Sequence, residues 1–77
     1  GMPLAQGETI AALFDLTPAE TRVYTAIADG RTLGETAKTL GISLATAKTH
    51  LLRLFAKTGT RRQAELVRLA GSFAAPL

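Results

Sequence analysis

The feature that most constrains this chain is a three-residue break between two short helical segments. Residues 32–51 read TLGETAKTLGISLATAKTHL, and Gly41-Ile42-Ser43 separates the two runs. Glycine ends helices because it adopts the left-handed conformation easily, and serine caps the first N–H groups of the next helix. Such a short connection sets the two helices at a steep angle, so the sequence predicts a helix-turn-helix. An ordinary helical hairpin with a glycine link is the alternative.

Capping signals divide the rest of the chain into further helices. Thr17, Pro18 and Glu20 open a helix with a capping box and a proline at its first position, and Gly30 ends it. The same box spacing recurs at residues 32 and 35 and at residues 60 and 63, and Gly71 follows the last helix. The predicted helices are residues 18–29, 33–40, 44–57 and 61–70.

The expected fold is therefore all-α, with four main helices and short connections. No alternating strand pattern or hairpin dipeptide occurs in the sequence. Residues 1–15 are interpreted as an N-terminal extension whose residues 8–14 form a short extra helix, and residues 16–77 as the domain. A chain of 77 residues fits one small domain with a marginal core. Val23, Tyr24 and Ile27 form the buried stripe of the first main helix.

Several function classes are disfavoured by composition. The chain has no cysteine and one histidine, so neither a disulfide nor a Cys/His metal site is expected. No carboxylate pair, nucleophile constellation or phosphate-binding glycine loop is present, so we expect no enzyme activity and no cofactor. His50 is interpreted as a packed side chain with one hydrogen bond. No apolar run approaches the roughly 20 residues of a membrane span, and a cytoplasmic protein is expected.

Charge is distributed unevenly along the chain. Residues 1–30 carry a net charge of −3 and residues 31–77 a net charge of +6. A basic half suits an acidic polymer such as nucleic acid, although many small domains have equally basic solvated surfaces.

Residues 44–57 are predicted to form an amphipathic helix with a weakly charged outer face. The inner side holds Ala47, Leu51, Leu54 and Thr58, with His50 and Phe55 at its edges. On the outer side, Lys48, Thr49 and Arg53 offer hydrogen-bonding groups suited to base edges, as does Thr46 at its flank. Ala45, Leu52 and Ala56 offer none. These three residues could contact thymine methyls, allow close approach to the backbone, or form a protein-binding patch.

Residues 16–70 resemble the LuxR-type helix-turn-helix domain of bacterial transcription regulators, in the winged-helix-like superfamily. The matching pieces are LTP-E (16–20), Gly30, E-A--LGIS (35–43), T-KTH (46–50), Lys57, Gly59 and Arg62 with AELV (64–67). The chain departs from the pattern at Ala19, Leu33-Gly34, Ala45, Ala47 and Leu52, several of which replace basic or polar residues. These departures reduce the expected phosphate and base contacts and leave the fold intact.

The resemblance implies four helices, of which the third reads the major groove and the fourth often dimerises. It implies a homodimer on double-stranded DNA, commonly at the C-terminus of a longer protein with an N-terminal sensory or receiver domain. We expect this chain to be either such an excised piece or a small stand-alone regulator. By position, Lys48 and Thr49 reach DNA and the Thr46 hydroxyl meets phosphate.

The resulting hypothesis is a sequence-specific DNA-binding module of a transcription regulator. The predicted DNA-binding residues are Thr46, Lys48, Thr49, Leu52, Arg53, Lys57, Arg61 and Arg62. The predicted dimer interface is Leu66, Val67, Leu69 and Ala70, unless all four pack within one monomer. The alternatives are a helix-turn-helix scaffold that binds a protein through Ala45, Leu52 and Ala56, and a DNA reader like region 4 of sigma factors.

Overall fold

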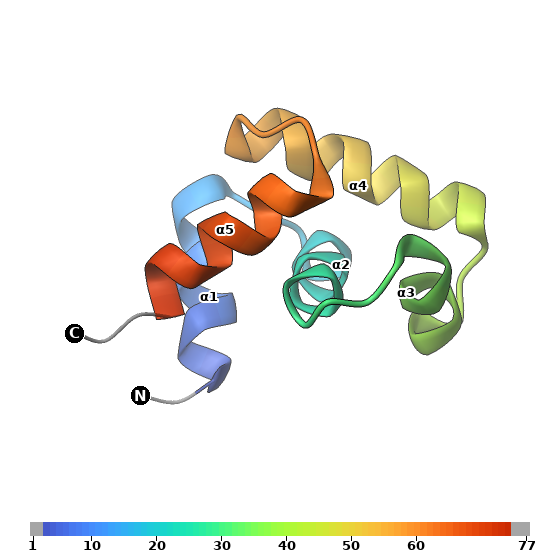
Figure 1. Cartoon of the computed structure of the whole chain (residues 1–77), viewed down its shortest axis with the longest axis horizontal. Coiled ribbons are helices and arrows are strands. Elements are labelled where there is room, and N and C mark those ends of the chain that lie inside the picture. Colours follow the sequence, from blue (N-terminus) through green and yellow to red (C-terminus); the bar gives the residue numbers. More distant parts are fainter. Residues whose placement is uncertain (1–2, 75–77) are drawn as a thin grey trace.

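The computed structural model describes residues 3–74, with side chains from Thr9 to Ser72. In that part of the chain, all the regular elements are helices, short turns connect them, and there is no strand. The helices are α1 (Pro3–Phe14), α2 (Pro18–Ala28), α3 (Leu33–Leu40), α4 (Leu44–Thr58) and α5 (Gln63–Ala74). Figure 1 shows α2 at the centre, α1 and α5 at one end, α3 at the other, and α4 along one side. The all-α prediction is confirmed.

The core lies around α2, which contacts each of the other four helices. Its side chains come from four helices: Ile10, Val23, Tyr24, Ile27, Leu51, Leu54 and Leu66. The predicted stripe of α2 is therefore confirmed. Ile10 is fully buried, so α1 packs as part of the same core, and it begins earlier than the expected helix at residues 8–14. The division of the chain at residue 15 stays a prediction.

Both capping boxes in the first half of the chain are confirmed. The Thr17 hydroxyl accepts from the Glu20 N–H at 3.1 Å, and the Glu20 carboxylate accepts from the Thr17 N–H at 3.0 Å. Thr32 and Glu35 make the same reciprocal pair at 3.1 and 2.8 Å. Each pair satisfies two N–H groups that the first turn of a helix leaves without partners, so α2 and α3 begin where the sequence predicted.

The predicted box at the start of the last helix is wrong. The Thr60 hydroxyl pairs with the Thr58 hydroxyl at 2.9 Å, and the Glu65 carboxylate accepts from the N–H groups of Arg61 and Arg62. A charged carboxylate is the stronger acceptor for these N–H groups, and α5 begins at Gln63. Gly71 was also expected to end this helix, but α5 continues to Ala74 because a helical glycine costs only about 1 kcal/mol.

The turn between α3 and α4 has the predicted construction. Gly41 has φ 67° and ψ 34°, the left-handed conformation that glycine adopts without strain, and the Ile42 N–H closes the turn on the Ala37 carbonyl at 3.0 Å. The Ser43 hydroxyl accepts from the Thr46 N–H at 3.0 Å and caps α4. Ala37 and Ala47 are buried, and Figure 1 shows α3 nearly end-on beside a lengthwise α4. The two helices therefore cross steeply as a helix-turn-helix, and they do not form the ordinary helical hairpin that was the alternative.

Candidate nucleic-acid interface

The outer face of α4, defined here as Ala45, Thr46, Lys48, Thr49, Leu52, Arg53 and Ala56, is exposed along its whole length. The opposite side buries Ala47, Leu51 and Leu54 in the core. Phe55 and Thr58 are half-buried, as the predicted helical wheel requires. The fold thus holds α4 rigidly by one side and leaves the other side free for a ligand.

Two threonine hydroxyls on this face are oriented by local hydrogen bonds. The Ser43 hydroxyl donates to the Thr46 hydroxyl oxygen at 2.9 Å, which leaves the Thr46 hydrogen free to donate outward. The Thr49 hydroxyl donates to the Ala45 carbonyl at 3.1 Å, so its oxygen lone pairs remain available to accept. The face therefore offers a donor suited to phosphate at its N-terminal end, and an acceptor suited to the amino group of adenine or cytosine one turn later.

The cations of this region fall into two groups. Lys48 and Arg53 are exposed on α4, and neither side chain has a hydrogen-bond or ion-pair partner among the described residues. Arg61 and Arg62 are exposed in the connection that leads into α5. The backbone N–H groups of Arg61 and Arg62 donate to the Glu65 carboxylate and lower its pKa. The positive charges of Arg62 and Arg68 lower it further, whereas slight burial acts in the opposite direction.

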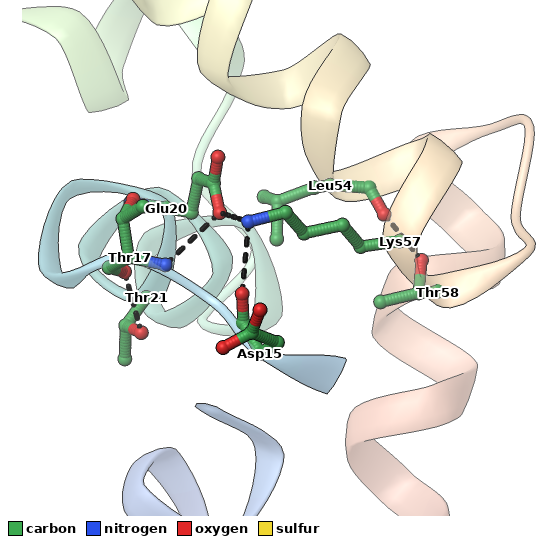
Figure 2. Close-up of polar contacts among 7 residues, drawn as sticks. All are labelled: Asp15, Thr17, Glu20, Thr21, Leu54, Lys57 and Thr58. Atoms are coloured by element: carbon green, nitrogen blue, oxygen red, sulfur yellow. Dashed lines mark hydrogen bonds and ion pairs between the residues drawn. The ribbon is translucent and has the colours of Figure 1, made fainter. Parts of the chain in front are cut away.

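Lys57 was expected to contact DNA phosphate, and the structure assigns it a different role. Figure 2 shows its ammonium pointing inward, 2.6 Å from the Glu20 carboxylate and 2.8 Å from the Asp15 carbonyl. Glu20 is 1% exposed, so Lys57 neutralises a buried charge. The ammonium thus already has two partners within the protein, and its expected phosphate contact stays a prediction.

The Glu20 carboxylate links three segments of the chain. It accepts from the Thr17 N–H at the start of α2 and from Lys57 near the end of α4. Lys57 in turn binds the carbonyl of Asp15, a residue with a left-handed φ of 55° between α1 and α2. Burial alone would raise the pKa of Glu20, but the hydrogen bonds and charge of Lys57, with the hydrogen bonds of Thr17, hold it below its ordinary value. This cluster fixes α4 to the α1–α2 corner.

The predicted dimer residues on α5 do not share one exposed surface. Leu66 is fully buried in the monomer core, so its assignment to an interface between subunits is corrected. Ala70 packs against the same core and Leu69 is half-buried, whereas Val67 is 42% exposed. Helical spacing alone does not separate the buried side of α5 from its exposed side, because apolar residues occupy four of the five positions from 66 to 70.

His50 is half-buried, but the expected hydrogen bond is missing. Its Nδ1 atom is buried and has no hydrogen-bond partner among the described residues. Ala19, Arg22, Leu40 and Ile42 line a cavity of about 60 Å³ beside it. Among the side chains that the structure describes, from Thr9 to Ser72, no group of three or more His, Cys, Asp or Glu is arranged to hold a metal ion.

The comparison with protein families identifies the domain. The family model described as bacterial regulatory proteins, luxR family, matches residues 15–70, and the chain belongs to this family. The matched region is the helix-turn-helix domain that binds DNA in transcription regulators, and domains of this type are not enzymes. No curated protein and no solved structure gave a significant match. None of the helices described here has the length and apolar character required to cross a membrane.

Proposed function

We propose that this luxR-family chain recognises specific sequences in double-stranded DNA by placing α4 in the major groove. The observation that carries the proposal is the outer face of α4, which stands clear of the core and presents Lys48, Thr49 and Arg53. An α-helix fits the major groove, where each base pair displays its own pattern of donors and acceptors. The family match favours this function over a protein-binding scaffold and over a sigma-like reader.

The residues divide into base contacts and phosphate contacts. Lys48 donates to acceptors such as guanine O6 and N7, and Thr49 uses its free lone pairs on a base amino group. Thr46 donates its free hydroxyl hydrogen to phosphate. Arg53, Arg61 and Arg62 neutralise phosphates, assisted by the N–H groups at the start of α5. Leu52 lies among the base contacts without any hydrogen-bonding group.

We also propose that the domain acts as a homodimer within a cytoplasmic regulator that has an N-terminal sensory or receiver domain. The exposed apolar surface of α5 supports a narrower interface than the sequence suggested, centred on Val67 with part of Leu69. The mass of the protein at high concentration, measured by light scattering with and without Val67→Glu, tests the dimer. A monomer at all concentrations, in the absence and presence of operator DNA, would rule it out.

The test of DNA recognition is selection of bound sequences from a random DNA pool at fixed salt. We expect one motif to be enriched, and Lys48→Ala to weaken binding to it by about 1–3 kcal/mol. Lys48→Arg keeps the positive charge and should preserve binding to unrelated DNA. Thermal unfolding of both variants controls for damage to the fold. A pool with no enriched motif would refute specific recognition, while unchanged binding of Lys48→Ala would refute only the role of Lys48.

A further inference from the structure

We infer that the outer face of α4 reads thymine methyl groups through Leu52, so that the target site carries a thymine opposite this side chain. This inference rests on the proposed function and specifies the class of DNA site. It starts from a line of three apolar residues along the centre of that face.

Ala45, Leu52 and Ala56 lie on one line because their spacings of seven and four residues correspond to whole helical turns. All three are exposed, and Leu52 as a residue retains 55% of its accessible surface. Lys48 and Thr49 lie one turn before Leu52, on either side of this line. The hydrogen-bonding groups therefore flank the centre of the face, and the centre itself has none.

The two alanines allow the helix to approach the bases closely. Each ends at its Cβ atom, so Leu52 is the only side chain on the line that projects further. A leucine placed against base edges cannot satisfy their donors or acceptors, and a polar edge left without a partner is costly. The C5-methyl of thymine is the apolar group that the common bases display in the major groove. Thymine is thus the base that Leu52 accommodates with a favourable contact.

The charge around Leu52 favours DNA over a protein partner as the occupant. Lys48 and Arg53 lie beside it, and neither has a partner among the described residues. An apolar protein surface docked here would remove both cations from water without compensation, whereas DNA supplies phosphates and base acceptors. Leu13 of α1 is slightly more exposed, at 60%, but it lies in the acidic half of the chain.

The experiment replaces each thymine of the selected site by uracil, which removes only the methyl group. For the wild-type protein, we expect about fourfold weaker binding at one position of each half-site, the effect of removing one buried methyl contact. Leu52→Ala should bind the thymine and uracil sites equally. Leu13→Ala is the matched control, because it removes an exposed leucine from another face and should keep the fourfold preference.

The outcomes separate this inference from the proposed function. An enriched site at which the wild-type protein tolerates every uracil would overturn the inference and leave specific DNA binding intact. A Leu52→Ala variant that keeps the methyl preference would also overturn it. Failure to enrich any site in the initial selection would overturn both. Unfolding curves of both leucine variants should match that of the wild type, because the two side chains lie outside the core.

Discussion

Replacing Lys57 by methionine should destabilise the protein although the residue lies near the surface. The substitution keeps an apolar stem of similar length and removes the ammonium that binds Glu20 at 2.6 Å and the Asp15 carbonyl at 2.8 Å. Removing one partner of a fully buried ion pair costs about 3–5 kcal/mol, because the remaining charge stays buried without compensation. The Lys57 side chain is 30% exposed, so water screens part of the interaction and we expect a loss of about 1–3 kcal/mol.

Such a loss is large for a domain of this size. Stabilities of about 0.05–0.15 kcal/mol per residue are typical, so Lys57→Met removes a substantial part of the total. The melting temperature should fall by about 4–8 °C for each kcal/mol lost. Urea unfolding at pH 7, followed by circular dichroism, measures the free energy directly.

Lys48→Met is the matched control for this measurement. It makes the same substitution in the same helix, at an exposed lysine without a partner among the described residues, and should change the stability by less than about 0.5 kcal/mol. A double-mutant cycle with Glu20→Gln isolates the coupling between the two charges, which we expect to be about 1 kcal/mol or more. Equal stability of the two methionine variants, or strict additivity in the cycle, would refute the reasoning.

Three further predictions follow from the caps, the turn and the basic connection. Because the pKa of Glu20 is lowered in the folded protein, its ionised carboxylate contributes fully to the stability above the unfolded pKa of about 4.3, and this contribution is lost as the pH falls through the lower folded pKa. Glu20→Gln should therefore flatten the acid side of the stability–pH curve, and an unchanged acid limb would contradict this. Gly41→Ala should destabilise the protein by about 1–2 kcal/mol, because Gly41 has a φ of 67°. Gly71→Ala should instead stabilise it by about 0.5–1 kcal/mol, because Gly71 is helical and nothing lies within 4 Å of the added Cβ. Urea unfolding of both variants checks the opposite signs. Arg61→Ala should weaken all DNA sequences alike and reduce the salt slope by about 0.9, and a loss confined to one sequence in binding titrations would argue against a phosphate contact.

The local features of the fold were predictable because their causes lie within three or four residues of one another. The caps at Thr17 and Thr32 and the left-handed Gly41 depend on the chain immediately around them, and all three have the expected geometry. The error at the start of α5 is also local. The Glu65 carboxylate accepts from the N–H groups of Arg61 and Arg62, and the sequence rule did not weigh this charged acceptor.

The features that sequence reasoning missed depend on contacts between distant segments. Glu20 and Lys57 are 37 residues apart, and nothing in the local pattern around Lys57 distinguishes it from a lysine that faces solvent. Leu66 likewise belongs to the core because α5 turns that side toward α2, which its apolar neighbours in sequence do not reveal. Charged residues of similar local sequence can thus be assigned to the fold or to DNA binding only when the tertiary contacts are known.

The role of Lys57 changes the electrostatics expected of DNA binding. Four cations of the proposed interface remain free to meet DNA, namely Lys48, Arg53, Arg61 and Arg62. If Arg53, Arg61 and Arg62 each meet one phosphate while Lys48 contacts a base, the logarithm of the affinity falls with the logarithm of salt with a slope of about −2.7 per monomer, compared with about −3.6 if Lys57 also met a phosphate. Since the Lys57 ammonium is bound to Glu20 in the folded protein, its removal should lower the stability and leave this slope unchanged. The same lysine substitution thus distinguishes a charge that holds α4 in place from the charges that α4 presents to DNA.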